Sequence, residues 1–469
     1  MGRKTKAKKN LREKIYTAGL GRMVRYMDKD PEKNIPKVLA WIEKTGRVQD
    51  QVAACREAFE NKDSNWNKLL MSFWTDVDDG ERLTLFENFI VNSNILGGER
   101  RDRTREKEGC NVPWAILMDP TSACNLHCTG CWAADYGNRL NMTLDELDSI
   151  ITQGEKMGIY MYIYSGGEPL VRKKDIIKLC EMHPDCEFLA FTNATLIDEA
   201  FANEMLRVRN FVPAISVEGF EEETDFRRGA GTYQKAVKAM EILKRKKLAF
   251  GISCCYTSKN IEVIGSEAYF DKMIELGAKF AWFFTYIPIG KDAVPELMAT
   301  PEQREFMFHQ IRMFRETKPL FTMDFWNDGQ YVNGCIAGGK DYCHINANGD
   351  IEPCAFIHYS DSNIREKTLL EAFKSPLFMA YHDNQPFNDN LLRPCPLLDN
   401  PEKLKMMVEQ SGAKSTDMQS PENVNDLTAK TKEAAEAWAP VADRLWNTCV
   451  KGEGPCASCK TPCGVAKNK

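Results

Sequence analysis

The sequence lacks any apolar run that approaches the roughly 18 residues needed to cross a bilayer as a helix. Seven basic residues and one acid lie between Arg3 and Lys14, but no apolar segment of the kind found in secretory signals follows them. Positive charge is not in excess either, since the formal net charge is −5, so composition does not indicate a nucleic-acid partner. These absences argue against a membrane-spanning or secreted protein and predict a cytoplasmic one.

Cysteine, in contrast, is abundant: there are 17 cysteines in 469 residues, and several stand two or three positions apart. In a cytosolic chain such clusters indicate metal ligation rather than disulfides. A secreted disulfide framework is the alternative, but no signal peptide supports it. Oxygen-sensitive metal clusters would place the protein in an anaerobic or strongly reducing cell.

The pattern of the chain predicts four regions. Residues 1–108 have apolar residues at helical spacing and are interpreted as a helical cap that covers the next domain. A basic amphipathic surface for a membrane or an acidic partner is the alternative, and the charged stretch Glu99–Glu108 is interpreted as a linker. The other regions are a strand–helix domain (109–325), a cysteine-bearing region (326–400) and a helical end with four cysteines (401–469).

Six apolar, β-rich runs separated by helical patterns occupy the second region. They are Trp114–Met118, Ile159–Tyr164, Glu187–Phe191, Val212–Val217, Ala249–Tyr256 and Lys279–Ile287. Apolar strands that alternate with helices predict a parallel sheet buried on both faces. Because six units fall short of the eight of a closed barrel, we predict an α/β fold with a partial (β/α)6 TIM-like barrel. Chemistry is expected at the C-terminal ends of its strands.

The first strand is followed by the sequence CNLHCTGCW, in which Cys124, Cys128 and Cys131 have the spacing C-x3-C-x2-C. Structural zinc uses four ligands, whereas three thiolates on a [4Fe–4S] cube leave one iron open to a small molecule. The triplet resembles the signature of radical S-adenosylmethionine (radical SAM) enzymes, which have an open, six-unit barrel. The resemblance implies that SAM chelates the fourth iron. The family usually has an aromatic residue where this chain has Gly130, and here Trp132 follows the third cysteine instead.

Later strand ends carry further motifs that resemble those of this family. Ser165–Pro169 resembles the GGEP motif that holds the SAM amino group, and Ser216–Gly219 resembles S-x-[DE]-G, which can hydrogen-bond the ribose. Asn193 stands where the family often has TNG, although it could be an ordinary turn residue. Arg228 directly precedes a glycine and is expected to pair with the SAM carboxylate, whereas Arg227 is interpreted as solvated. The implied SAM-binding residues are Gly166, Gly167, Glu168, Pro169, Asn193, Ser216, Glu218 and Arg228.

The last predicted strand is unusually aromatic, with the sequence FAWFFTY. Core packing is the preferred interpretation, but rings that face the barrel mouth would favour a substrate with apolar bulk. A group of other cysteines is interpreted as small hydrophobic residues of the core. These are Cys55, Cys110, Cys180, Cys186, Cys254 and Cys255.

The third region contains Cys335, Gly349 and Cys354, with thirteen and four residues between them, and Asn348-Gly349 predicts a tight hairpin. This pattern resembles the first half of a SPASM or twitch extension, which implies an auxiliary [4Fe–4S] cluster. Cys343 and Cys395 could complete its four ligands. Zinc is the alternative metal, since cysteine number alone does not separate zinc from iron.

Four cysteines at the spacing C-x6-C-x2-C-x3-C predict another metal site near the end of the sequence. They are Cys449, Cys456, Cys459 and Cys463. The spacing departs from the SPASM consensus C-x2-C-x5-C-x3-C. A second [4Fe–4S] cluster, a zinc ion and a single iron therefore all stay open.

The resemblance implies an enzyme that cleaves SAM reductively to a 5′-deoxyadenosyl radical, which then abstracts hydrogen from an unactivated C–H bond. It also implies a reducing partner such as ferredoxin or flavodoxin. Oxidation or cross-linking of a peptide or protein is the leading hypothesis. One alternative is chemistry on a membrane lipid, with the basic N-terminus as a peripheral membrane contact. Another is a non-catalytic iron–sulfur scaffold or electron carrier, which would not need Gly166–Pro169 or Arg228.

Overall fold

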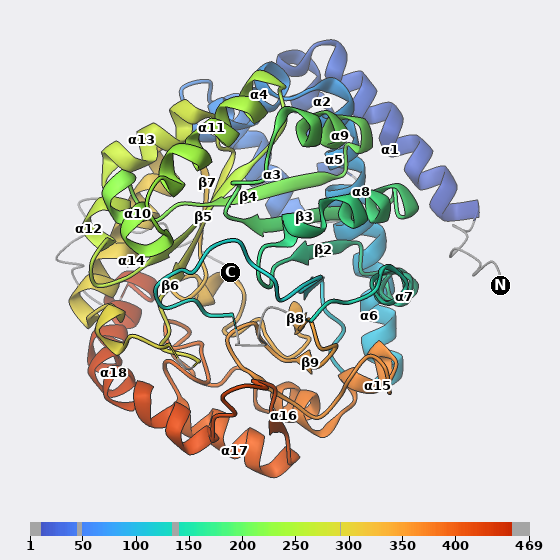
Figure 1. Ribbon diagram of the computed structural model, residues 1–469. Coiled ribbons are helices and arrows are strands. Elements are labelled where there is room, and N and C mark those ends of the chain that lie inside the picture. Colours follow the sequence, from blue (N-terminus) through green and yellow to red (C-terminus); the bar gives the residue numbers. More distant parts are fainter. Residues whose placement is uncertain (1–10, 45–48, 134–139, 291, 453–469) are drawn as a thin grey trace.

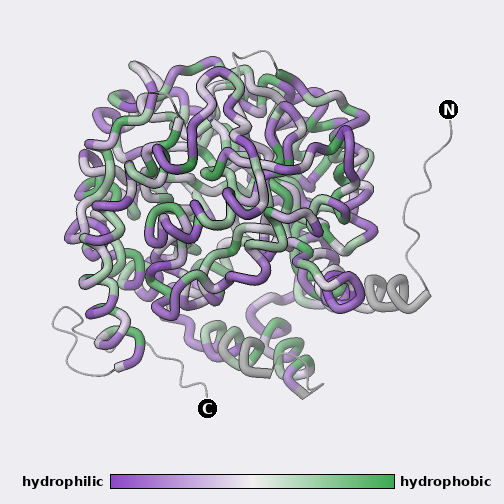
Figure 2. The backbone as a smooth tube through the Cα atoms, turned by 90° about the horizontal axis from the view of Figure 1, so that it is seen from below, coloured by the Kyte–Doolittle hydropathy of each residue, from purple (hydrophilic) through white to green (hydrophobic). Residues whose placement is uncertain are grey.

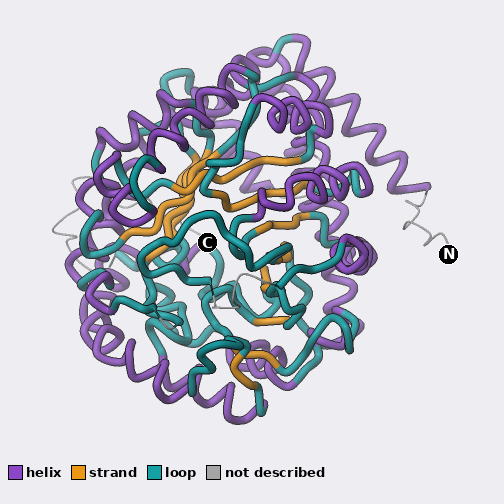
Figure 3. The backbone as a smooth tube through the Cα atoms, viewed as in Figure 1, coloured by secondary structure: helices purple, strands orange, loops and turns teal. Residues whose placement is uncertain are grey.

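The computed structural model describes residues 11–44, 49–133, 140–290 and 292–452 (Figure 1). A nine-stranded sheet in the order β7-β6-β5-β4-β3-β2-β1-β8-β9 forms its centre, and helices surround the sheet (Figure 3). Neighbouring strands are parallel except in the β8–β9 hairpin. The strands of the predicted barrel are β1 (Ala115–Met118), β2 (Met161–Tyr164), β3 (Glu187–Thr192), β4 (Phe211–Ser216), β5 (Gly251–Tyr256) and β6 (Phe280–Thr285).

Helices return the chain from the end of each strand to the start of the next. They are α7 (Leu144–Met157), η2 (Pro169–Arg172), α8 (Lys173–Met182), α9 (Glu199–Val208), α10 (Glu221–Arg228), α11 (Thr232–Arg245), α12 (Ile261–Ile264), α13 (Glu267–Leu276), η3 (Pro295–Leu297) and α14 (Pro301–Thr317). Local chemistry sets these boundaries: α7 begins at a capping box of Thr143 and Glu146 and ends at Gly158, which has a φ of 93°. The six predicted β/α units are present, and the predicted α/β partial barrel is confirmed.

Three short strands extend the barrel sheet beyond the six predicted ones. β7 (Phe321–Asp324) follows α14 and pairs in parallel with β6. β8 (Tyr342–Ile345) pairs in parallel with β1, on the opposite edge of the barrel, and continues into β9 (Ile351–Glu352). The predicted hairpin at Asn348-Gly349 joins β8 to β9. The cysteine-bearing region 326–400 therefore contributes strands β8 and β9 to the same sheet as the barrel.

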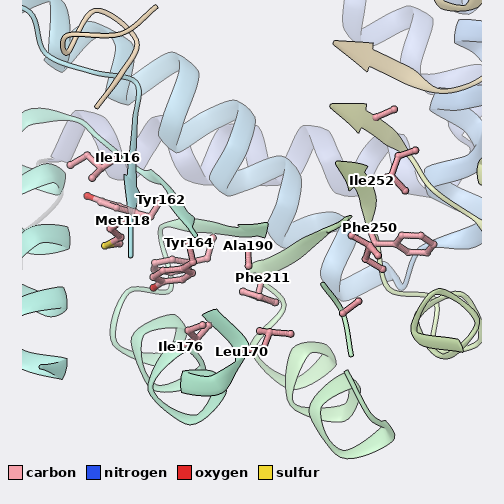
Figure 4. Packing of buried hydrophobic residues seen from close by; sticks show 14 of the residues in the cluster. Ile116, Met118, Tyr162, Tyr164, Leu170, Ile176, Ala190, Phe211, Phe250 and Ile252 are labelled. Atoms are coloured by element: carbon pink, nitrogen blue, oxygen red, sulfur yellow. The ribbon is translucent and has the colours of Figure 1, made fainter. Parts of the chain in front are cut away.

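Side chains of the barrel strands alternate between two apolar layers. Ile116 and Met118 lie in the layer between sheet and outer helices, where Tyr164 stacks on Phe188 with ring centroids 5.7 Å apart (Figure 4). Leu117 belongs to a second layer inside the barrel. Burial on both faces explains why the strands read as continuous apolar runs. Hydrophilic and hydrophobic residues alternate along the outer helices, as expected of helices with one buried face (Figure 2).

The N-terminal helices pack against the barrel where its strands begin. They are α1 (Leu11–Lys29), α2 (Pro31–Lys44), α3 (Gln49–Glu60), α4 (Asn65–Asp76), α5 (Asp79–Leu85), the π-helix η1 (Phe86–Leu96) and α6 (Gly97–Glu108). The buried carboxylate of Glu81 accepts a hydrogen bond from the backbone N–H of Ala249, just before β5. The predicted linker Glu99–Glu108 is instead part of α6, because Arg101 is buried and donates to the carbonyls of Ser93 and Gly158.

The C-terminal part completes the ring of helices in Figure 1. Its elements are η4 (Gly329–Tyr331), β10 (Tyr359–Ser360), α15 (Leu369–Phe373), α16 (Pro376–Asn384), α17 (Pro401–Ser411), β11 (Lys414–Ser415), α18 (Val424–Leu445) and the π-helix η5 (Trp446–Val450). The basic residues before Leu11 and most of the last cysteine group lie outside the described residues. Within the described part of the chain, none of the helices combines the length and the apolar character that crossing a bilayer requires.

Candidate functional site

The three cysteines of the first triplet lie in the loop that follows β1, at the C-terminal end of the barrel. Cys124 and Cys128 are partly exposed and Cys131 is exposed. All three line one cavity of about 190 Å³. The same cavity is lined by six of the predicted SAM-binding residues: Gly166, Gly167, Glu168, Asn193, Ser216 and Arg228. The fold therefore gathers the ends of four strands around the cysteine loop, as expected for a barrel with its chemistry at this end.

The loop after β2 is bonded directly to the loop that carries the cysteines. The N–H of Gly167 donates to the carbonyl of Thr121 at 3.0 Å, and the N–H of Glu168 donates to that of Ala123 at 2.8 Å. A Cβ atom at position 167 would lie 2.2 Å from the Ala123 carbonyl oxygen, so only glycine permits this approach. The two motifs form one rigid unit.

Glu168 is fully engaged within the protein. Its carboxylate accepts hydrogen bonds from the hydroxyl of Thr192 at 2.7 Å, the N–H of Asn193 at 2.8 Å and the N–H of Leu170 at 2.9 Å. The residue is 1% exposed, and burial raises the pKa of its carboxyl. Glu168 thus ties the end of β3 to the cysteine loop while it lines the cavity. Pro169, the next residue, begins η2 and does not line the cavity.

Two arginines share one buried carboxylate at the end of β4. Arg227 and Arg228 both bond Glu218 Oε1, at 2.7 and 2.5 Å, and Glu218 Oε2 accepts from the N–H of Cys255. Burial alone would raise the pKa of Glu218, but the two guanidinium groups outweigh it and hold the pKa below its ordinary value. The interpretation of Arg227 as solvated is wrong, because it is 7% exposed. Glu218 does not line the cavity, and its carboxylate holds Arg228, which does.

Asn193 joins the turn after β3 to the cysteine loop. Its side-chain amide donates to Asn125 Oδ1 at 2.9 Å, and its own oxygen accepts from Thr195. Ala194, where a glycine is common, has a φ of 60°. Asn193 is therefore both a turn residue and a cavity residue, so the two interpretations from the sequence do not exclude each other.

Sequence reasoning missed Tyr286, which packs on the cysteine loop. Gly130 has a φ of 61°, and a Cβ atom there would lie 2.7 Å from the Tyr286 ring. The Tyr286 hydroxyl accepts from the N–H of Val294. Trp132 instead turns toward the auxiliary region, with its ring 5.6 Å from Phe356. Two signals in the sequence could have found Tyr286. Gly130 stands where the family usually has an aromatic residue, and Tyr286 directly follows the aromatic strand.

Aromatic rings form the rest of the cavity wall. On β6, Phe283 packs into the outer core as predicted, whereas Trp282 and Phe284 line the cavity. Phe191 meets both of these rings, at 5.3 and 5.6 Å. Phe325 meets Phe284 at 5.3 Å. Away from the cysteine loop, the cavity is thus mostly hydrocarbon.

A second cavity adjoins the first and gathers three more cysteines: Cys335, Cys354 and Cys395. Cys354 Sγ accepts a hydrogen bond from the Tyr342 hydroxyl at 2.8 Å, and burial raises its pKa to about 12. The two cavities share four lining residues, which are Ile287, Phe325, Ile336 and Phe356. An apolar partition therefore separates two sulfur-rich sites.

Comparison with known proteins identifies the domain that holds the first site. Residues 118–263 match the family model described as the Radical SAM superfamily. The chain contains a radical SAM domain and is an enzyme of that superfamily. The match spans the cysteine triplet, the glycine loop after β2 and the paired arginines.

Curated relatives of this radical SAM enzyme include an AdoMet-dependent heme synthase from Methanosarcina barkeri, 23% identical over 56% of this chain and 83% of the relative. A cysteine-type anaerobic sulfatase-maturating enzyme from Clostridium perfringens is 24% identical over 56% of this chain and 80% of the relative. Among solved structures, Streptococcus suis SuiB bound to its precursor peptide SuiA has a TM-score of 0.52 at 19% identity. That likeness covers 64% of this chain and 75% of SuiB, and it supports the fold.

The structure separates one predicted metal ligand of this radical SAM enzyme, Cys343, from its expected partners. Cys343 is fully buried in the outer core layer, because alternate residues of β8 face opposite sides and Tyr342 is the neighbour that points to Cys354. Cys343 therefore does not join the second cavity. Cys449 is buried in an apolar cluster with Trp438. Its predicted partners Cys456, Cys459 and Cys463 lie outside the described residues.

The cysteines interpreted as core residues are mostly buried in the described structure. Cys110, Cys180, Cys186 and Cys254 are buried, and Cys255 is partly exposed and lines the first cavity. Cys55 is exposed on α3, so its assignment to the core is wrong. Adjacent positions on β5 place Cys254 and Cys255 on opposite faces, as predicted.

Proposed function

We propose that this chain cleaves SAM reductively and abstracts a hydrogen atom from an unactivated C–H bond. One observation carries the proposal: three cysteines, the glycine loop and Arg228 line a single cavity that continues into an aromatic wall. Three thiols from one loop suit a [4Fe–4S] cluster with one open iron. The guanidinium of Arg228, on the same cavity, suits a carboxylate such as that of SAM.

In this proposal Cys124, Cys128 and Cys131 hold the cluster. The bound cluster and SAM would supply the radical chemistry: with an electron from a reducing partner such as ferredoxin or flavodoxin, a carbon–sulfur bond of SAM would break to give methionine and a 5′-deoxyadenosyl radical, which would take the substrate hydrogen. Gly166 and Gly167 let the loop after β2 pack directly against the cysteine loop. Asn193, Ser216 and Arg228 offer hydrogen-bond donors to SAM. Glu168 and Glu218 hold these groups in place, and the aromatic wall excludes water from the side of the cavity away from the cysteine loop.

We propose a peptide or protein as the substrate. A sulfatase-maturating relative and the fold shared with SuiB in complex with its precursor peptide support this class. Cys335, Cys354 and Cys395 would hold an auxiliary cluster, with iron–sulfur favoured over zinc by the resemblance. Its position behind Phe325 and Phe356 would let it accept the electron that remains on the substrate after hydrogen abstraction. Oxidation or cross-linking would follow.

A membrane lipid is the second candidate substrate, because the wall of Trp282, Phe284 and Phe191 suits an acyl chain. Flotation with vesicles of anionic phospholipid separates the two candidates, since lipid chemistry requires that the protein rise with the vesicles. Retention of the protein in the dense fraction, together with modification of a peptide, would reject the lipid.

The test of the radical chemistry is anaerobic reconstitution with iron and sulfide, addition of SAM and dithionite, and chromatography for 5′-deoxyadenosine. We expect 5′-deoxyadenosine from the native chain and none from Cys124→Ala. If the native protein with its full complement of iron forms none and SAM leaves the EPR signal of the reduced cluster unchanged, the proposal fails. SAM binding is followed separately by the change that SAM causes in the EPR signal of the reduced cluster.

A further inference from the structure

A second group of metal-binding side chains lies at the opposite end of the barrel, where the strands begin. It consists of Glu155 on α7, His183 at the end of α8 and Cys186 directly before β3. Glu155 Oε1 lies 3.3 Å from His183 Nδ1 and 3.4 Å from Cys186 Sγ. His183 is 4% exposed and Cys186 is fully buried. These residues belong to neither cavity of the proposed reaction.

The separations between these atoms match those of ligands around one metal ion. In tetrahedral zinc, bonds of about 2.0 Å to nitrogen and oxygen and about 2.3 Å to sulfur place N and O about 3.3 Å apart and O and S about 3.5 Å apart. A charge-assisted hydrogen bond from histidine to carboxylate would be shorter, about 2.7–2.9 Å. The 3.3 Å between His183 Nδ1 and Glu155 Oε1 matches the separation of two ligands of one ion, although a weaker hydrogen bond also has this length.

A second carboxylate holds the imidazole from its far side. Nε2 of His183 lies 3.0 Å from Asp148 Oδ1. Metal-bound histidines characteristically donate their other ring N–H to a carboxylate, which orients the ring and sets the tautomer. With the proton on Nε2, Nδ1 presents its lone pair toward Glu155 and Cys186.

Three buried asparagines fix the loop His183–Cys186, whose ends have the spacing H-x2-C. Asn210 donates to the carbonyls of His183 and Cys186, at 3.2 and 3.1 Å. Asn88 donates to Pro184 and Cys186, both at 3.0 Å, and Asn92 donates to Asp185 at 3.1 Å. Every carbonyl of the loop is thus bonded by a side chain from η1 or from the residue before β4. These bonds hold His183 and Cys186 in place independently of the contacts that the two residues make with Glu155.

We propose that Glu155, His183 and Cys186 bind a divalent transition metal, with zinc as the ion that best suits a carboxylate, an imidazole and a thiolate. With water as its fourth ligand, the ion would join α7, α8 and the residue before β3 and so stabilise the N-terminal end of the barrel. Burial raises the pKa of the Cys186 thiol, so binding displaces its proton to solvent. The interpretation of Cys186 as a plain core residue is then incomplete.

Zinc content of the reconstituted holoprotein tests this proposal. We expect His183→Gln, Cys186→Ala and Glu155→Gln each to lose one zinc per chain by mass spectrometry of the metal, with iron and sulfide unchanged. Cys180→Ala is the matched control, because Cys180 is equally buried on α8 but lies outside the group. His382→Gln, at an exposed histidine, is the second control.

Thermal unfolding gives a readout that does not depend on the other cysteines. A zinc chelator should lower the Tm of the native holoprotein and leave the Tm of Glu155→Gln unchanged, since that variant keeps the shape of the side chain but loses its charge. Equal zinc in the native chain and all three variants would overturn the proposal. The group would then be a hydrogen-bonded polar cluster without metal.

Discussion

Two groups of three cysteines lie on adjoining cavities, and they are built in different ways. The first group comes from eight consecutive residues of one loop, and its last member, Cys131, is exposed. The second group comes from three separate segments around a buried thiol, Cys354, that accepts a hydrogen bond from Tyr342. The first group therefore needs only one loop, whereas the second forms only when the β8–β9 hairpin and the segment around Cys395 are folded together.

This difference is the one expected if the two sites have different roles in the proposed reaction. The loop of the first site faces groups for a charged ligand, among them Arg228 and Ser216. The second site is surrounded by rings and aliphatic side chains such as Trp326 and Leu397. A site with groups for a charged ligand suits a cofactor that is exchanged in each turnover, and a site among rings and aliphatic side chains suits electron transfer.

The largest effect on SAM cleavage is expected from substitutions in the first cysteine group. Cys128→Ala should abolish 5′-deoxyadenosine formation, because two thiolates do not hold the cluster in the geometry that SAM needs. The iron bound by the second cysteine group should remain. Chromatography and iron analysis measure both outcomes, and cleavage that persists in the variant would contradict the assignment of the triplet.

Removal of cysteines from the second group should separate product formation from SAM cleavage. Cys335→Ala with Cys354→Ala should lose the iron of one cluster and block product formation, yet retain SAM cleavage. Cys343→Ala is the matched control. Cys343 is buried on the face of β8 opposite to Tyr342 and the second cavity, so this variant should keep all of its iron. Loss of iron in the control alone would mean that Cys343, and not the three cysteines of the second cavity, holds the cluster.

Glu218→Gln should destabilise the fold by about 3–5 kcal/mol, because two buried guanidinium groups lose their counter-charge. SAM affinity should also fall, since Arg228 is no longer held. Denaturant unfolding and SAM titration measure the two effects. Glu222→Gln, at an exposed position on α10, should change the free energy of unfolding by less than about 0.5 kcal/mol. Equal stability of the two variants would remove the structural role of Glu218.

Gly130→Ala should have a smaller effect, through the backbone and the ring above it. A left-handed φ costs alanine about 1–2 kcal/mol, and the new methyl group meets the Tyr286 ring. Tyr286→Leu should relieve the clash, so the double variant should cleave SAM faster than Gly130→Ala alone. A double-mutant cycle on the cleavage rate checks this, and additive effects would show that Tyr286 does not support the loop.

The sequence alone predicted the features that depend on short spacing and on periodicity. The C-x3-C-x2-C triplet presents three thiols from one loop in any fold that leaves the loop open. Continuous apolar strands between amphipathic helices specify a parallel sheet, and the confirmed partial barrel follows from that pattern. The glycine pair after β2 also predicted a close backbone approach, which the structure shows to be made to the cysteine loop rather than to a ligand.

Only the tertiary structure decided which distant side chains meet. The burial of Arg227 against Glu218, the placement of Tyr286 over Gly130 and the exclusion of Cys343 from the second cavity all depend on which elements become neighbours. The union of Glu155 with His183 and Cys186 depends on the packing of α7 beside α8. Local patterns carry no information on such pairs, because the energy that brings them together is spread over the whole apolar core.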